Sequence, residues 1–215
     1  MIQDFATPVF HNPFAIMNAI GLVAFAFVGS SKAIGEEFDL FGIVTVGLAM
    51  AFAGGVTRDL LVTRVPLALQ SPLEIGLALL GAGLAIALNV GLSAPETHPV
   101  VLVSDAIGLA AFATTGAIVA TEATVSAFGV VAVATINAVG GGAVADILLD
   151  RPPFILFEDF YASCAVLGGS AYWVAVQVGA TGSTTAAACA VVTVGTRVTA
   201  VRYNWNLPAV QSVRF

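Results

Sequence analysis

Charged residues are scarce in this chain. Only 9% of the 215 residues are Asp, Glu, Lys or Arg, and Lys32 is the sole lysine. A soluble domain carries about a quarter charged residues, so the chain lacks the polar surface of a water-soluble enzyme. Seven basic residues against thirteen acidic ones cannot form a phosphate-binding face, which excludes a nucleic-acid-binding protein. Intrinsic disorder is excluded as well, because it requires low hydrophobicity.

Cysteines and catalytic motifs are scarce too. The two cysteines, Cys164 and Cys189, both lie in apolar runs and indicate neither a disulfide framework nor a metal cluster. The sequence carries no Ser-His-Asp set, no metal-ligand spacing, no Walker loop and no dinucleotide fingerprint. We therefore expect no enzymatic activity, no catalytic residue, no cofactor and no metal site.

Apolar sequence is abundant: 59% of the residues are hydrophobic, and the mean hydropathy is +1.00. Apolar runs of bilayer-spanning length occur seven times, at residues 14–31, 40–62, 72–91, 99–119, 125–149, 157–178 and 182–202. The first run has no preceding basic residue and no persuasive cleavage site, so we interpret it as a retained helix rather than a signal peptide. The sequence predicts an all-α membrane protein with seven transmembrane helices in a single domain, residues 1–215.

The few basic residues predict the orientation, because cytoplasmic loops are enriched in Lys and Arg. With seven spans, the N-terminus shares a side with connections that hold only Arg64. Lys32, Arg151, Arg202 and Arg214 fall on the other side. We therefore expect a multi-pass protein of the cell membrane with its N-terminus outside and its C-terminus in the cytoplasm.

The chain contains an internal repeat with an offset of 87 residues. Residues 19–66 and 106–153 align without a gap and share 20 identities in 48. The identities include pairs that a biased composition rarely produces by chance: Asp59 with Asp146, Arg64 with Arg151, and Pro66 with Pro153. Each copy contains three helices, and an odd number of crossings places the start of the next copy on the opposite side of the membrane. The second copy (about 99–178) must therefore be inverted relative to the first (about 14–91). Helix 182–202 stands outside the repeat. Many transporters place their path between inverted repeats.

Each copy carries a glycine cluster followed by a charged group. The predicted path residues of these clusters are Gly54, Gly55, Arg58 and Asp59 in the first copy, and Gly140, Gly141, Gly142 and Asp146 in the second. Consecutive glycines favour a kink or local unwinding, which would offer backbone carbonyls to a cation near a carboxylate. The alternative is that the glycines only allow close helix packing. Because the clusters are in register, we favour the broken helix.

The charged residues within the spans each have two interpretations. Arg58 and Asp59 either snorkel to the interface or face a water-filled path. Asp105, whose repeat partner is Asn18, is either a helix cap or a pore residue, and we include it among the path residues. Lys32 is interpreted as an interfacial anchor. Small polar residues either line a hydrated path or bond to helix carbonyls: Thr114, Thr115, Thr135 and Asn137.

These motifs together resemble the prokaryotic trimeric intracellular cation (TRIC) channel family. The resemblance starts with Gly-Gly-x-x-Arg-Asp at residues 54–59 and continues with the segments 105–112 and 151–156. Tyr161-Ala162, Arg197 and the segment 202–208 complete it. The matching motifs extend over residues 14–208, and their order and spacing are more specific than any one of them.

The resemblance implies a homotrimer with one pore per protomer. It further implies passive permeation of monovalent cations, chiefly potassium with sodium as a second candidate, past second and fifth helices kinked at their glycines. The implied partners are these ions, membrane lipids and two further copies of the chain, with no nucleic acid. Two positions depart from the family pattern: Ala53 replaces a third glycine, and Ala145 replaces an arginine, which leaves Asp146 without a neighbouring cation.

Two other function classes remain open. The same family domain has also been labelled a glycine transporter, so a secondary transporter of a small zwitterion such as glycine is the main alternative. In such a carrier, the glycine breaks would present helix ends to a carboxylate and an ammonium group. A membrane scaffold without transport would need neither broken helices nor embedded charges.

Overall fold

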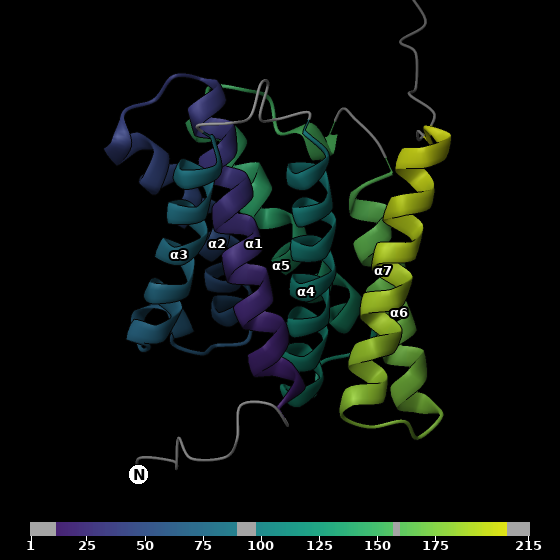
Figure 1. Ribbon diagram of the computed structural model, residues 1–215. Helices are drawn as coiled ribbons and strands as arrows, with labels where there is room; N and C mark the ends of the chain where they lie inside the picture. The colour runs from purple at the N-terminus through teal and green to yellow at the C-terminus, as the bar shows by residue number, and fades with distance from the viewer. Residues whose placement is uncertain (1–11, 90–97, 157–159, 206–215) are drawn as a thin grey trace, which may run out of the picture.

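The computed structural model describes residues 12–89, 98–156 and 160–205, and this part of the chain is helical without any strand (Figure 1). The long helices are α1 (Pro13–Gly35), α2 (Leu40–Leu61), α3 (Pro72–Asn89), α4 (Pro99–Glu122), α5 (Ala127–Leu148), α6 (Ala162–Gln177) and α7 (Ser183–Tyr203). Two short 3-10 helices follow α2 and α5, namely η2 (Leu67–Leu69) and η4 (Phe154–Leu156). The predicted all-α class with seven helices is confirmed.

Five helices are long and apolar enough to cross a membrane: α1, α2, α4, α5 and α7, each of 21 to 24 residues. At a rise of about 1.5 Å per residue, they are as long as the apolar core of a bilayer is thick. The remaining two are shorter, with 18 residues in α3 and 16 in α6. The predicted spans 72–91 and 157–178 therefore correspond to shorter helices, and residues 90–91 and 157–159 of those predictions lie outside the described residues.

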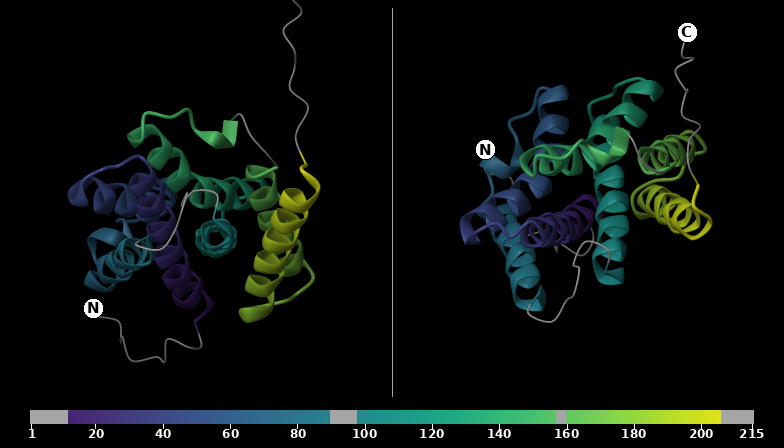
Figure 2. Two further views of the ribbon diagram at one scale, coloured as in Figure 1. Left: turned by 45° about the horizontal axis from the view of Figure 1, so that its top comes forward. Right: turned by 90° about the horizontal axis from the view of Figure 1, so that it is seen from above.

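The two halves of the bundle run in opposite directions. Figure 1 shows α1 rising from the lower end of the molecule and α4 descending from the upper end. Helix α7 packs against α6 and α4 and lies with α6 at one edge of the bundle, as both views in Figure 2 show. Helices α1 and α4 are the most buried of the spanning helices and pack against each other, so the interior of the bundle is where the two halves meet.

The 87-residue repeat extends to the details of the turns. Asp39 caps α2 by accepting a hydrogen bond from the amide of Gly42, and Ser126 caps α5 in the same way from Gly129. Residues in the left-handed region of backbone space also recur 87 positions apart: Glu37 with Thr124, and Thr63 with Asp150. Helices η2 and η4 have the same spacing. The two copies thus share local geometry even where their residue types differ.

A reciprocal contact joins α1 to α4 at the centre of the bundle. The rings of Phe25 and Phe112, repeat equivalents, pack edge to face with centroids 5.0 Å apart. A Cβ at Gly21 would lie 2.3 Å from the Phe112 ring, and one at Gly108 would lie 2.2 Å from the Phe25 ring. Each half therefore provides a glycine that makes room for the phenylalanine of the other.

Candidate functional site

Helices α2 and α5 cross in backbone contact at their glycines. A Cβ at Gly54 would lie 2.1 Å from the carbonyl oxygen of Asn137, and one at Gly141 would lie 1.9 Å from that of Met50. Both helices run through their glycine clusters without interruption. The predicted local unwinding is therefore wrong. Close packing is what these two glycines provide, because any side chain would separate the backbones.

The flanking glycines have different surroundings. A Cβ at Gly140 would lie 3.3 Å from the Cα of Gly54, and one at Gly142 would lie 3.5 Å from the ring of Phe154. Gly55 faces a more open and polar space. A Cβ there would have as its nearest neighbours the Nη2 of Arg58 at 3.8 Å and the Oδ1 of Asn137 at 3.9 Å. A kink that preserves the helical hydrogen bonds stays a prediction.

Arg58 and Asp59 form a buried ion pair near the end of α2. The Nε of Arg58 donates to the Oδ1 of Asp59 at 2.7 Å, and the amide of Leu67 in η2 donates to Oδ2 at 2.9 Å. The two residues are only 2% and 4% exposed, so the snorkelling interpretation is wrong. Together with Phe14, Arg64 and others, they line a cavity of about 420 Å³. The ring of Phe14 lies over the Arg58 guanidinium at 5.4 Å.

Asp146 occupies the equivalent position in the second half, but its cation comes from another helix. The Nζ of Lys32 on α1 donates to Oδ1 at 2.8 Å, and the amide of Phe154 in η4 donates to Oδ2 at 3.0 Å. The side chains of Lys32 and Asp146 are 17% and 4% exposed. Two predictions are therefore wrong: Lys32 is an ion-pair partner rather than an interfacial anchor, and Asp146 has a cation despite Ala145.

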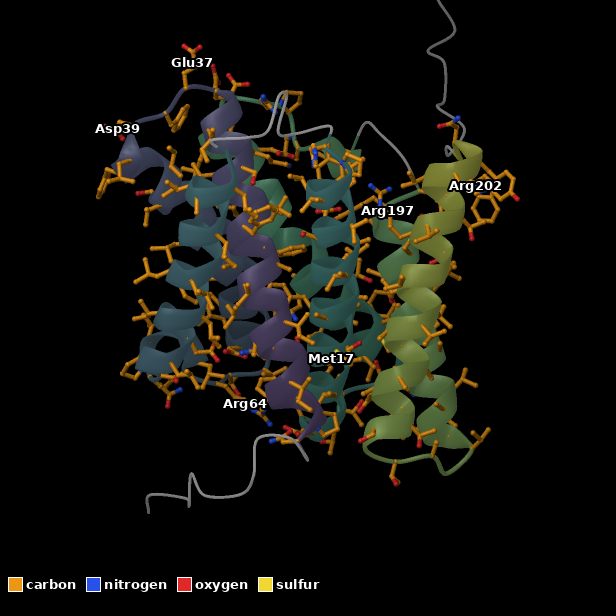
Figure 3. All side chains as sticks on the ribbon, viewed as in Figure 1. Met17, Glu37, Asp39, Arg64, Arg197 and Arg202 are labelled. Atoms are coloured by element: carbon orange, nitrogen blue, oxygen red, sulfur yellow. The ribbon has the colours of Figure 1, made fainter. Side chains whose placement is uncertain are left out.

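Ion pairs between the halves lie at both ends of the bundle. Arg64, which follows α2, pairs with Glu122 at the end of α4 at 3.2 Å. Its repeat equivalent Arg151, which follows α5, pairs with Glu36 at the end of α1. Figure 3 shows Arg64 at the lower end, opposite the end that carries Glu37, Arg197 and Arg202. Arg64 is thus separated from Arg202 as the charge pattern predicts, while Arg214 lies outside the described residues.

Asp105 is hydrogen-bonded inside the second half. Its Oδ1 accepts from the Tyr161 hydroxyl at 3.0 Å, and the guanidinium of Arg197 on α7 lies 4.7 Å from the Tyr161 ring centre. Because His98 caps α4 and Asp105 is 9% exposed inside the helix, the cap interpretation is wrong. Its repeat partner Asn18 also bonds a third helix, donating to Oε1 of Glu74 on α3 at 2.6 Å.

Glu74 is a buried charged residue that the sequence patterns did not indicate. It is a 9% exposed carboxylate in the first turn of α3, beyond the end of the aligned segment 19–66. Extending the 87-residue offset would have paired Glu74 with Tyr161, a match that no identity count detects.

The small polar residues divide between the two predicted roles. Thr114 and Thr135 bond to helix carbonyls four residues earlier. Asn137 instead spans two helices, donating to the carbonyl of Phe112 at 2.6 Å and to the hydroxyl of Thr115 at 2.9 Å. Its Oδ1 and the Nη1 of Arg58 are buried and accept or donate no hydrogen bond within the described part of the chain. Such groups are satisfied by water where space allows.

Sequence comparisons place the chain among membrane proteins. A family model described as glycine transporter matches residues 15–89 and 102–177. A UPF0126 membrane protein of Deinococcus radiodurans is 35% identical over 160 residues, covering 73% of this chain and 74% of the relative. The UPF0126 membrane protein YvgT of Bacillus subtilis is 34% identical over 203 residues, covering 90% and 94% respectively.

Three solved TRIC channel chains superpose on this structure over most of their length. A chain solved in work on conductance through TRIC cation channels superposes with a TM-score of 0.83 at 33% identity, covering 93% of this chain and 98% of that one. A prokaryotic TRIC channel crystallised in 0.5 M KCl superposes with a TM-score of 0.83 at 28% identity, covering 90% of this chain and 98% of that one. The TRIC orthologue from Rhodobacter sphaeroides superposes with a TM-score of 0.78 at 25% identity, covering 89% of this chain and 98% of that one.

Proposed function

Because this chain belongs to the TRIC cation channel family, we propose that it is a membrane channel for monovalent cations, chiefly potassium. The observation that carries the proposal is the pair of buried carboxylates, Asp59 and Asp146, held in equivalent geometry in the two inverted halves. Buried charges in a membrane protein are costly and usually mark an ion pathway. The superposition on three TRIC channel chains supports the same conclusion.

The proposed path runs along the crossing of α2 and α5. The space beside Gly55 supports this location, because it is bordered by the buried and unsatisfied Oδ1 of Asn137 and by the guanidinium of Arg58. A hydrated cation can exchange a water molecule for the Oδ1 of Asn137, whereas the remainder of the crossing is closed by backbone contact. The residues predicted from the sequence are proposed to line this path or, at Gly54 and Gly141, to hold together the two helices that border it. The full set is Gly54, Gly55, Arg58, Asp59, Asp105, Gly140, Gly141, Gly142 and Asp146.

A carrier of glycine or another small zwitterion is the second candidate. The description of the matching family model favours it, and the paired cationic and anionic groups at Arg58 and Asp59 are of the kind that would bind a zwitterion. The continuous helices argue against it, since they present no free helix ends within the glycine clusters.

Purified protein in planar bilayers separates the two functions. We expect discrete unitary currents in potassium salts, with a reversal potential in a salt gradient that shows cation selectivity. Liposomes loaded with glycine should show no saturable counterflow of labelled glycine. Absence of unitary currents together with such counterflow would reject the channel in favour of the carrier.

We also propose a homotrimer in the cell membrane with one path per protomer, the N-terminus outside and the C-terminus in the cytoplasm. A single chain supplies both carboxylates, which supports one path in each protomer rather than one shared path. Mass measurement of the detergent-solubilised protein should give three copies of the 21.8 kDa chain. A monomer or dimer under mild detergent conditions would contradict this assembly.

A further inference from the structure

An apolar groove of about 530 Å³ lies on the outside of α1, between α3 and α4. Its floor includes two buried side chains of α1, Ala24 and Phe27, which are 9% and 5% exposed. Its rim consists of larger apolar side chains that are 40–50% exposed and come from all three helices: Ile20, Leu84, Leu88, Val100 and Ile107. Because the rim is exposed, the groove is open to the surroundings of the protein.

The groove exists because α1 packs closely against two helices that do not pack against each other. Helix α1 contacts both α3 and α4, whereas α3 and α4 share no extended contact among the described residues. A Cβ at Gly81 on α3 would lie 2.3 Å from the carbonyl oxygen of Val23, so α3 approaches the backbone of α1. On its other side, α1 meets α4 through the reciprocal glycine and phenylalanine contacts. Figures 1 and 2 show α1 between the other two helices.

The lining of the groove suits hydrocarbon. Of the eleven described residues that line it, ten are apolar, and the remaining one is Ser104. A lining of this kind offers almost no hydrogen bonds to water and no charge to an ion or a zwitterion. Both α1 and α4 are long and apolar enough to cross a membrane, so the groove faces the hydrocarbon region of the bilayer.

The groove has the length of one leaflet and the width of one hydrocarbon chain. Along α3 it extends from Leu77 to Leu88, which is about 16 Å at a rise of about 1.5 Å per residue. The hydrocarbon region of one leaflet is about 15 Å thick, half of about 30 Å. A volume of about 530 Å³ over that length gives a mean cross-section of about 33 Å², whereas a helix about 10 Å in diameter needs about 80 Å². The groove is therefore too narrow to admit a helix, but it accommodates a single acyl chain.

The groove also has the direction of a lipid chain. Leu88 is one residue from the end of α3, and Val100 is the second residue of α4. Both lie at the end of the bundle opposite Arg64 (Figures 1 and 3), which is the cytoplasmic end in the proposed orientation. From there the groove reaches inward to Leu77 and Ile107. A lipid chain likewise begins below its headgroup and runs toward the middle of the bilayer.

We propose that this groove binds one acyl chain of a phospholipid in the leaflet at the α3–α4 end. Lipid tails are as apolar as the helices, so burial from water provides no driving force within the membrane. What favours the bound chain is contact on three sides with α1, α3 and α4, because an empty groove loses that dispersion energy. The bound chain supplies the contact that α3 and α4 do not make with each other. The proposal is independent of whether the protein conducts ions.

Native mass spectrometry of the protein extracted in mild detergent counts the bound phospholipid. We expect one phospholipid to remain with each wild-type chain. Ala19→Phe and Ser104→Phe each place a ring in the groove, one from α1 and the other from α4. Because the ring and the acyl chain compete for the same space, each variant should lower the bound phospholipid by about tenfold, the effect of an ordinary overpacking cost.

A phosphatidylcholine with a photoreactive group at the end of its acyl chain locates the site. Reconstituted with the wild type, it should label the inner end of the groove, at Leu77 and Ile107, and Ser104→Phe should abolish this labelling. Lipids that only surround the protein would label exposed apolar residues on every helix alike. Uniform labelling of that kind would contradict the proposal.

Val191→Phe is the matched control, because it adds the same ring to a residue of α7 that is 69% exposed. It should retain the phospholipid and the labelling. Absence of phospholipid from the wild type, its retention in both folded groove variants, or its equal loss from Val191→Phe would overturn the proposal. Conversion of an oligomer to a monomer by the groove variants would overturn it too, since the groove would then be a contact between copies of the chain.

Discussion

Gly141→Ala is expected to destabilise the fold strongly, whereas Gly83→Ala is expected to leave the fold unchanged or slightly more stable. The new Cβ at residue 141 would lie 1.9 Å from the carbonyl oxygen of Met50. That oxygen belongs to the interior of α2, so it cannot move without displacing the helix. Overpacking usually costs about 1–3 kcal/mol. Because the added Cβ would meet the backbone of α2 and not a side chain that can move, we expect a cost of about 3 kcal/mol or above. Denaturant unfolding in detergent measures it.

Two glycines serve as controls for this prediction. Around Gly83 on α3, nothing lies within 4 Å of an added Cβ, so alanine adds only its better helix propensity, about 1 kcal/mol. Gly55 lies on the crossing helix α2 itself, but its nearest contacts are 3.8 Å away. Gly55→Ala should therefore fold. If Gly141→Ala unfolds at the same denaturant concentration as Gly55→Ala, the backbone contact at the crossing is not what holds α2 to α5.

Asp146→Asn is expected to lower both the potassium conductance and the free energy of unfolding. The variant leaves the Lys32 ammonium without its partner at 2.8 Å, while the asparagine oxygen still accepts from the amide of Phe154. Breaking a buried ion pair costs about 3–5 kcal/mol; because Lys32 is partly exposed, we expect the lower end of that range. Loss of the carboxylate also removes an attractive charge for cations. Denaturant unfolding and bilayer recordings measure the two effects separately.

The double variant Lys32→Met/Asp146→Asn distinguishes the two effects. It removes the unpaired ammonium, so it should be more stable than Asp146→Asn, while the carboxylate that we assign to the path is still missing and its contribution to conductance is not restored. An unchanged current–voltage relation in folded Asp146→Asn would show that this carboxylate does not face the path. Equal stability of the single and double variants would show that the ion pair contributes nothing to folding.

The helices and the inverted repeat were predictable because they depend on information within short segments. Apolar runs of bilayer length specify helices wherever they occur, and the repeat is evident in identities such as Asp59 with Asp146. The role of the glycines was not predictable in the same way. Gly54 and Gly141 are equally compatible with an unwound helix and with a close crossing, and the choice depends on which backbone approaches them in space.

The electrostatic partners were even less accessible from the sequence. Asp146 and Lys32 are 114 residues apart, and nothing in either segment indicates that α1 and α5 end side by side. Ala145 suggested that the second half had lost its cation, because only the neighbouring position was compared. Asn18 and Glu74, 56 residues apart, have the same difficulty. Their equivalents are Asp105 and Tyr161, so the conserved property is one carboxylate per pair and not a residue type.

The reciprocal contact of Phe25 and Phe112 with Gly108 and Gly21 has a consequence for the origin of the chain. Each partner helix carries Gly-x-x-x-Phe, and each phenylalanine fits over the glycine of the other. A surface of this kind is self-complementary, so it forms an isologous pair with an antiparallel copy of itself. The covalent connection between the halves is not needed to make that contact. A single half could therefore have dimerised in both membrane orientations before gene duplication joined two copies into one polypeptide.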